Sequence, residues 1–264
     1  MTATQIPSGP VWALRDSWAE AMRHLRAVPR SPELLVFSTI QPVMFVLLFA
    51  YVFGGSIQVP GYADYNQFLI PGVFAQTVLF GSAFTGVGLA EDLSKGLVDR
   101  LRSLPIYEPA IIVGRTISDM ARNIVTFIVM IVVAYAIGFR IEGSLLEAVV
   151  ATLLLFAFSY AFSWIQALIG LSVGSVEAAN SAGFIWMFPL TFLSSAFVDP
   201  SNMPAWLARI ANVNPFTIVT NATRALYNGR SPGNDLWFAL AWAVGITIVF
   251  STLAVRKFKR SAAR

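Results

Sequence analysis

Charged and amide side chains are rare inside the long apolar stretches of this sequence, and those few are the ones that could do chemistry. Asp119, Arg122 and Asn123 stand at positions i, i+3 and i+4 of one stretch, so on a helix they share a face. We favour a local ion pair near the end of the stretch, where an arginine side chain can reach toward water. The alternative is a relay for protons or for a substrate, because charges within a membrane usually serve a function.

Other kinds of chemistry are excluded by what the sequence lacks. There is no cysteine, which rules out disulfides, thiolate metal sites and cysteine nucleophiles. His24 is the single histidine, which rules out a histidine-rich metal site and disfavours histidine catalysis. No G-x-x-x-x-G-K-[ST] segment is present to cradle nucleotide phosphates. We therefore predict no catalytic residue, no metal site and no cofactor in this chain, which is expected not to be an enzyme.

The composition indicates a membrane protein. Apolar residues make up 56% of the 264 positions and charged residues only 12%, against about 25% charged in soluble domains. The net charge of +4 is explained by membrane topology rather than by nucleic acid, which we do not expect as a partner.

Six apolar blocks are long enough to cross a bilayer, which takes about 20 helical residues. They cover residues 34–53, 68–90, 117–137, 148–173, 178–198 and 236–255. The predicted fold class is therefore an all-α integral membrane protein, a bundle of six transmembrane helices in a single domain over 34–255.

Two flanking segments complete the predicted organisation. Residues 1–33 repeat apolar positions every three or four residues between charged ones, which predicts an amphipathic helix in the membrane interface. Pro29 and Pro32 end this helix. Residues 256–264 form a basic tail.

Arginine and lysine placement predicts that both termini are cytoplasmic. With the N-terminus inside, 14 of the 18 basic residues fall on the cytoplasmic side. The four that remain outside are Arg140, Arg209, Arg224 and Arg230.

The loop over residues 91–116 is the most distinctive connection. Leu93, Leu97, Leu101 and Leu104 form an apolar stripe opposite a charged side, which predicts a short helix begun by Ser94 and ended by Pro105. One interpretation is a surface helix that covers the inner mouth of the bundle. The other is a helix presented to a cytoplasmic partner, with charges that orient docking.

Several further features of the sequence bear on packing or on function. The abundant aromatic residues of the fourth and fifth blocks are explained by packing or lipid contact, or more sharply by an aromatic path for a flat amphiphile. Amides such as Gln166 and Asn180 more simply bond between helices. Gly170 and Gly174 permit close helix approach, either within the chain or between chains. Residues 199–235 are too interrupted to span and suit short helices that dip into the outer leaflet.

The order of these features, together with three local patterns, carries a family resemblance. The patterns are Leu-Ser-Ser-Ala-Phe at 193–197, Met-Pro-Ala-Trp-Leu at 203–207 and Asn-Pro-Phe-Thr at 214–217. The chain resembles the ABC type-2 permeases, and within them the daunorubicin-resistance branch. Glu91, Gly96, Asp99 and Arg100 match the family's loop, whereas Leu97 replaces its threonine.

The resemblance implies the permease half of an ATP-driven exporter in the cell membrane, for a hydrophobic or amphiphilic drug, antibiotic or lipid. Its partners would be a separate ABC ATPase, which holds ATP and Mg²⁺, and a second permease copy, which forms a homodimer. The residues expected to contact the ATPase through a coupling helix are Glu91, Asp92, Lys95, Gly96, Asp99, Arg100, Leu101, Arg102 and Pro105. A substrate path is expected along Gln166, Asn180, Phe184, Trp186, Phe188 and Phe192. An outer gate is expected at Trp206, Asn214, Pro215 and Phe216.

Other functions stay open on the residues alone. A polysaccharide or glycolipid export permease would share the same features, and so would an ion-gradient-driven secondary transporter. An intramembrane enzyme or assembly scaffold is disfavoured, because only Asp119 offers a candidate acid.

Overall fold

The structure, a computed structural model, describes residues 10–27, 32–53, 59, 61–62, 64–102, 107 and 109–261, apart from the side chains at 10–11, 13–14, 24–27, 32–38, 53, 99 and 102. These residues form helices and no strand. The helices are α1 (Pro10–Ala27), α2 (Pro32–Leu48), the π-helix η2 (Phe49–Phe53), α3 (Tyr65–Gly81), α4 (Ala83–Ser94), α5 (Leu97–Arg102), α6 (Pro109–Ala136), α7 (Leu145–Gly170), α8 (Val176–Phe192), the 3-10 helix η3 (Pro200–Asn202), α9 (Ala205–Val213), α10 (Pro215–Tyr227) and α11 (Asp235–Ser261).

Four helices in the described part of the chain are long and apolar enough to cross a membrane. They are Tyr65–Ser94, which joins α3 and α4 through a turn at Ser82, then Pro109–Ala136, Leu145–Gly170 and Asp235–Arg260. The predicted all-helical membrane bundle is confirmed at this level. The other two apolar blocks correspond to shorter helices, α2 and α8, of 17 residues each.

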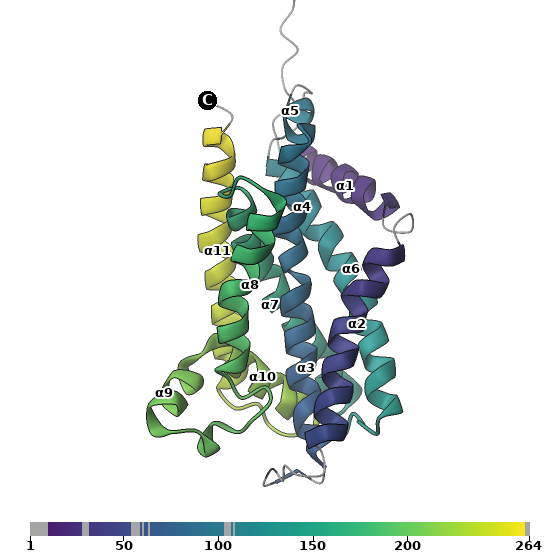
Figure 1. The fold of residues 1–264 in the computed structure, drawn as a ribbon, viewed down its shortest axis with the longest axis vertical. Coiled ribbons are helices and arrows are strands. Elements are labelled where there is room, and N and C mark those ends of the chain that lie inside the picture. Colours follow the sequence, from purple (N-terminus) through teal and green to yellow (C-terminus); the bar gives the residue numbers. More distant parts are fainter. Residues whose placement is uncertain are drawn as a thin grey trace, which may run out of the picture.

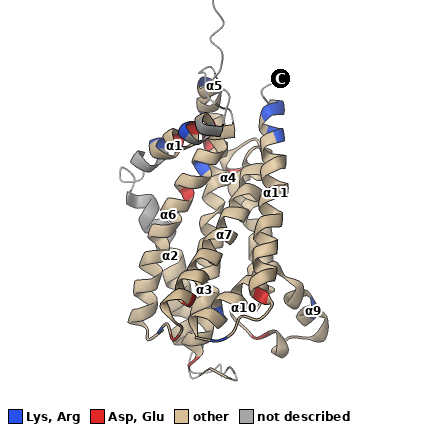
Figure 2. Cartoon of the chain, turned by 180° about the vertical axis from the view of Figure 1, so that it is seen from behind, with Lys and Arg blue, Asp and Glu red and all other residues tan. Residues whose placement is uncertain are grey.

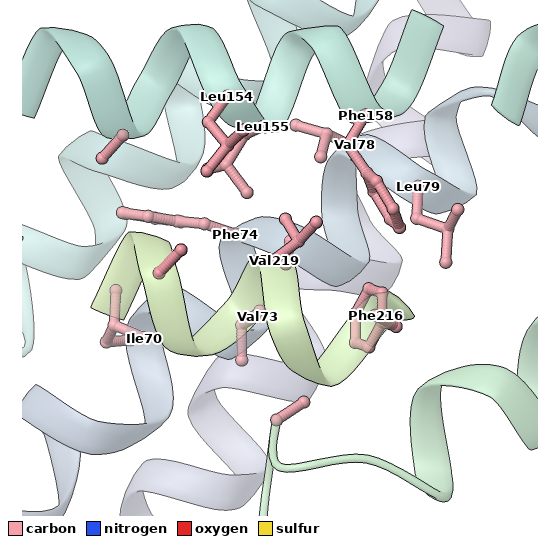
Figure 3. Packing of buried hydrophobic residues seen from close by; sticks show 14 of the residues in the cluster. Ile70, Val73, Phe74, Val78, Leu79, Leu154, Leu155, Phe158, Phe216 and Val219 are labelled. Carbon is pink, nitrogen blue, oxygen red and sulfur yellow. The ribbon is translucent and has the colours of Figure 1, made fainter. Parts of the chain in front are cut away.

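The α3–α4 helix lies at the centre of the bundle. Of its most apolar 18-residue window 89% is buried, against 22% for α11 at the periphery. Figure 3 shows why: Phe74 and Val78 of α3 point into a core shared with Leu154 and Phe158 of α7 and with Phe216 of α10. The ring of Phe74 also makes edge contacts with Phe127 and Tyr227, at centroid distances of 5.0 and 5.8 Å.

Local sequence signals explain where several helices begin. Ser144 and Glu147 form a reciprocal capping box at the start of α7, which satisfies two of the backbone N–H groups that a helix start leaves open. The Ser175 hydroxyl accepts from Ala178 N at the start of α8. Asn214 caps α10 and is followed by Pro215 at the first helical position, where its fixed φ and missing N–H cost nothing.

The amphipathic helix predicted near the N-terminus is present as α1, and it packs on the bundle through its small and polar residues. Ser17, Glu20 and Ala21 are buried against α6, while Trp18 is 61% exposed. The contact depends on Gly114 of α6, where an added Cβ would lie 2.4 Å from Glu20 Cβ. Small size on α6, rather than apolar character on α1, therefore selects the packed face.

The two ends of the bundle are built differently (Figure 1). α1, α5 and the C-terminal end of α11 lie together at one end, while α9 and α10 lie at the other. Figure 2 shows Lys and Arg gathered on α1, α5 and the last turns of α11, whereas the middle of the bundle is almost free of charged residues in the described part of the chain. We call these the α1 end and the α10 end.

One boundary differs clearly from the sequence prediction. The block predicted to span 178–198 is helical only to Phe192. The Ser194 hydroxyl bonds back to Thr191 O, and the chain then turns away over residues 193–199. Serine hydroxyls that compete for backbone groups favour such helix ends.

Candidate functional site

The connection between α4 and α6 lies at the α1 end and holds the residues predicted to contact a partner. The single coupling helix predicted there is divided in two. α4 ends at Ser94, whose hydroxyl donates to Glu91 O at 2.8 Å, so Ser94 ends a helix instead of beginning one. Gly96 follows with φ of +65°, a left-handed conformation that glycine adopts at little cost. The six-residue helix α5 then begins at Leu97.

The described side chains of this connection fall into two groups. Val98 is fully buried in a cluster with Ile111, Ile112 and Phe258, and Leu101 packs against it. Lys95 is exposed and forms an ion pair with Glu91 at 2.5 Å. Because the Glu91 carboxylate accepts this hydrogen bond, the pKa of Lys95 is raised above its ordinary value. α5 is thus anchored by apolar contacts while charge stays accessible.

Of the other predicted coupling residues, Arg100 is exposed. Asp92 turns inward instead, toward α6. The side chains of Asp99 and Arg102, and the whole of Pro105, lie outside the described residues.

Asp92 is the first member of a buried chain of charges. Its carboxylate lies 3.3 Å from Arg115 Nη1, and Arg115 Nε donates to Asp119 at 3.1 Å. Asp119 also accepts from Arg122 Nη2 at 2.9 Å. Each of these four side chains is at most 14% exposed. The ion pair predicted between Asp119 and Arg122 is present, but it belongs to a longer chain that reaches α4, and both side chains are buried instead of reaching toward water.

Gly88 makes this chain of charges possible. A Cβ placed at Gly88 would lie 1.5 Å from Arg115 Nη2. Glycine on α4 therefore leaves the space that the guanidinium of α6 occupies. In a low-dielectric interior a buried charge without such a partner is strongly destabilising.

A cavity of about 150 Å³ adjoins the end of this chain of charges. It lies between α2, α3, α4, α6 and α8. Its walls combine aromatic rings with amide, hydroxyl and guanidinium groups. They are Gln41, Pro42, Phe45, Gln76, Thr77, Phe80, Gly81, Phe84, Arg122, Asn123, Thr126 and Phe184. A largely apolar cavity with a few convergent polar groups is the usual form of a small-molecule site.

Three residues of the predicted substrate path form a row on α8. Phe184, Phe188 and Phe192 succeed one another at four-residue spacing, and neighbouring rings lie 5.8 and 6.1 Å apart. Phe80 of α3 contacts both Phe184 and Phe188, at 5.5 and 5.3 Å. Phe184 alone of the predicted path lines the cavity, so the row leads away from it.

The other three path residues lie apart from the cavity. Gln166 of α7 is fully buried, and its amide nitrogen lies 2.9 Å from Met187 Sδ of α8. Trp186 stacks on Phe162 at 5.4 Å. Asn180 is exposed. The structure thus gives Gln166 and Trp186 contacts between α7 and α8.

The residues predicted to form an outer gate occupy the α10 end. The Asn214 amide nitrogen donates to Leu190 O and Leu193 O, both at 2.7 Å, so Asn214 ties the end of α8 to the start of α10. Pro215 begins α10, and Phe216 is fully buried beside Phe158. Trp206 on α9 is 66% exposed.

Arg224 of α10 was missed as a structural residue, because the sequence placed it among the exterior arginines. It is 3% exposed and donates to Phe68 O at 2.8 Å, to Ser195 O at 2.7 Å and to Ala196 O at 3.2 Å. Its guanidinium also stacks 3.8 Å above the Phe68 ring. One side chain therefore joins α10, α3 and the turn after α8.

Signals for the missed residues were weak. The spacing of the charges indicated that Asp119 pairs with Arg122. Asp92 pairs with Arg115, which is 23 positions further along the chain, and no local pattern indicates that contact. Gln76 stood out only as an amide in an apolar block. Arg224 lies on α10, which is buried on most of its sides. Its sequence pattern nevertheless resembles that of a surface helix, so burial of Arg224 could not be predicted.

A helical bundle with apolar membrane-length helices, charges gathered at its ends and an amphipathic cavity inside it defines a multi-pass membrane protein of the transport class. The chain belongs to the ABC-2 type transporter family, whose model matches residues 16–228. It is similar to the daunorubicin resistance ABC transporter permease protein DrrB1 of Streptomyces coeruleorubidus, with 33% identity over 91% of this chain and 85% of that protein.

More distant relatives share the same description as permeases. The probable doxorubicin resistance ABC transporter permease protein DrrC of Mycobacterium tuberculosis (strain H37Rv) is 19% identical over 86% of this chain and 82% of that protein. The probable multidrug ABC transporter permease YbhR of Escherichia coli (strain K12) is 26% identical over 75% of this chain and 53% of that protein. The family resemblance read from the sequence is thereby confirmed.

Proposed function

We propose that this chain is the permease subunit of an ATP-driven exporter that moves a hydrophobic or amphiphilic drug, antibiotic or lipid across the cell membrane. The similarity to a permease named for daunorubicin resistance, over 91% of this chain, carries the proposal. The chain contains no P-loop, so ATP and Mg²⁺ would be bound by a separate ATPase subunit. A second, identical permease copy would complete the translocation path.

The proposed topology has six spans with both termini in the cytoplasm. α2 with η2, the joined α3–α4, then α6, α7, α8 and α11 would cross the membrane. The α1 end, which carries most of the arginine and lysine, would face the cytoplasm. α9 and α10 would enter the outer leaflet from the other side and act as the gate.

The absence of cysteine makes this topology directly testable. Single replacements Lys95→Cys and Lys259→Cys at the α1 end, and Arg209→Cys and Ser231→Cys at the α10 end, all lie at exposed positions. A membrane-impermeant maleimide added to intact cells is expected to label the second pair only. Labelling of the first pair from outside would contradict the proposed orientation.

The proposed coupling surface comprises the exposed charges around α4 and α5. Burial of Val98 and Leu101 fixes α5 to the bundle, so a push on α5 by the ATPase would move α4 and α6 with it. ATP binding and hydrolysis would in this way shift the bundle between two arrangements.

Co-expression with a candidate ATPase from the same operon, followed by purification on a tag on this chain, tests the proposal. We expect the ATPase to be recovered, and we expect the double replacement Asp99→Ala with Arg100→Ala to reduce its recovery or its coupled hydrolysis. Arg209→Ala, at an exposed site of the α10 end, is the matched control. Failure to recover any ATPase over a range of mild detergents would count against an ATP-driven exporter and favour an ion-gradient-driven transporter.

A further inference from the structure

The cavity beside Arg122 has an asymmetry that bears on the kind of ligand it accepts. Among the described residues, one guanidinium lines it and no carboxylate does. Asp119, the partner of Arg122, lines a separate small space with Asn123 and Ser159. A ligand in the cavity would therefore meet the cationic end of the buried chain of charges.

The order of charges along that chain sets the sign of the field in the cavity. Asp92, Arg115, Asp119 and Arg122 alternate and sum to zero, but Arg122 stands at the cavity. Because Coulomb energy falls with distance, the nearest charge dominates the potential felt by a ligand. Asp119 is also shared between two arginines, so it neutralises Arg122 only in part.

Arg122 has hydrogen-bonding capacity left for a ligand. A guanidinium carries five N–H donors, and Arg122 has a single hydrogen bond, to Asp119, in the described part of the chain. The Phe84 ring lies against its other side, 4.3 Å from the guanidinium carbon. The side chain is therefore held in place on two sides while donors remain unused.

Two buried amides next to it each contain one unpaired atom. Gln76 Nε2, a donor, and Asn123 Oδ1, an acceptor, have no hydrogen-bond partner among the described residues, and both residues are 4% exposed. The Asn123 side-chain nitrogen already donates to Val78 O and Ser159 Oγ, at 2.8 and 2.9 Å. Both unpaired atoms are themselves buried behind the cavity wall, so a ligand could pair with either one only after that side chain rotates; because buried polar atoms are nearly always paired, a polar ligand group would favour such a rotation.

The apolar part of the wall is aromatic and leads to the surface. Phe45, Phe80, Phe84 and Phe184 line the cavity, and Gln41 at its edge is exposed. About 150 Å³ is smaller than the roughly 300 Å³ or more of a drug-sized pocket. The cavity therefore suits a head group with a few methylenes, while the rest of a chain leaves past Gln41.

We infer that this cavity binds the head of an anionic amphiphile, a phosphate monoester or carboxylate on an apolar chain. Arg122 donates to its oxygens, and the phenylalanines contact the adjacent methylenes. A cationic head of the same size is disfavoured by repulsion from Arg122. The inference rests on the proposed function, in that the bound amphiphile is the cargo.

The test uses the permease with its ATPase in nanodiscs of zwitterionic lipid. The probes share one twelve-carbon chain and differ in the head: dodecyl phosphate, dodecanoate, dodecanol and dodecyltrimethylammonium. Equilibrium binding is expected to favour the two anions over the cation by about tenfold or more, the effect of charge-assisted hydrogen bonds. Equal or tighter binding of the cation by the unaltered protein would overturn the inference.

Variants then locate the effect. Arg122→Gln is expected to weaken binding of the anions about tenfold while binding of dodecanol stays within about twofold. Arg122→Lys, which keeps the charge, is expected to retain the preference for anions should the glutamine variant fail to fold. Arg209→Gln makes the same charge change at the α10 end and is expected to alter nothing. Equal loss in both glutamine variants would show a membrane-wide charge effect instead of a site.

The two proposals fail separately in these experiments. If an ATPase co-purifies but anions are not preferred, the exporter proposal stands and the charge of its cargo is wrong. If anions bind through Arg122 but no ATPase is recovered, the cavity stands and the exporter proposal fails.

Discussion

Two arginine sites, one at each end of the bundle, bury positive charge in different ways. Arg115 and Arg122 are paired with carboxylates, in a chain that alternates in sign. Arg224 instead donates to three backbone carbonyls and to Asn221 Oδ1, with its guanidinium on a Phe68 ring. The α10 end thus uses a buried charge to fasten backbone segments, whereas the α1 end balances its buried arginines with carboxylates.

The carbonyl-based site should be the more costly to break. Arg224→Met removes a donor from three buried backbone carbonyls at once, and each unsatisfied buried group costs about 1–3 kcal/mol. We expect a loss of about 4 kcal/mol in the free energy of unfolding, measured as a lowered midpoint of thermal unfolding in detergent. Arg224→Lys keeps the charge but not the planar fork of donors, and it should fall between the two proteins. A methionine variant as stable as the original would contradict the fastening role.

The site built on carboxylates should lose stability when Asp119, the carboxylate shared by Arg115 and Arg122, is replaced. Asp119→Asn leaves both Arg115 and Arg122 short of negative charge, and breaking a buried ion pair costs about 3 kcal/mol. Asp92→Asn removes one carboxylate from Arg115, which keeps Asp119, and should cost less, about 1 kcal/mol. Thermal unfolding of the two single variants and the double variant measures the coupling between them. Equal effects of the two single replacements would show that Asp119 is not the shared member.

The close approach of α7 to α4 near the α1 end should make a smaller contribution to the free energy of unfolding, and a nearby glycine provides a control. Gly170 lies against the backbone of Gly86, where an added Cβ would be 2.3 Å from Gly86 O, while Gly174 has nothing within 4 Å. Gly170→Ala should cost about 2 kcal/mol through overpacking of α7 on α4. Gly174→Ala should leave the unfolding midpoint within experimental error. The reverse order would mean that Gly174, not Gly170, mediates a contact.

The exposed ion pair at the α1 end should matter least for stability. The side chains of Lys95 and Glu91 are 68% and 46% exposed, and exposed pairs contribute little to stability. Lys95→Ala is expected to leave the unfolding midpoint unchanged while reducing ATPase recovery in the co-purification assay. A clear drop in stability would assign this pair to the bundle and not to the partner surface.

The sequence predicted the helical membrane class because the decisive signal is local. Blocks of about 20 apolar residues are readable directly from the chain, whereas the helix start predicted at Ser94 was wrong, because Ser94 ends α4. The order of the features and the three local patterns between 193 and 217 carried the family resemblance, which the family match over residues 16–228 confirmed. The assignment of individual residues to a coupling surface, a substrate path and a gate stays a prediction.

The positions of side chains were a different matter, because they depend on contacts between distant segments. The sequence did not show which side of α1 packs on α6: Glu20 is buried because Gly114 of α6 leaves room for it, while Trp18 stays exposed, as the apolar side of an interfacial helix would be. Phe184 lines the cavity while Trp186, two residues on, stacks on α7. Helix periodicity gives the angle between two such residues but not which neighbour each one meets.

The sequence by itself determined that this chain is a helical membrane protein of a particular family, with charge concentrated near its ends. Tertiary structure alone decided which arginines are buried and what satisfies them. Arg224 could be placed only once the turn after α8 and the start of α3 were seen to present carbonyls to α10. The physical reason is that the length of an apolar block, a local property, decides whether a helix can cross the bilayer. The free-energy cost of burying a polar group instead depends on partners that are far away in the chain.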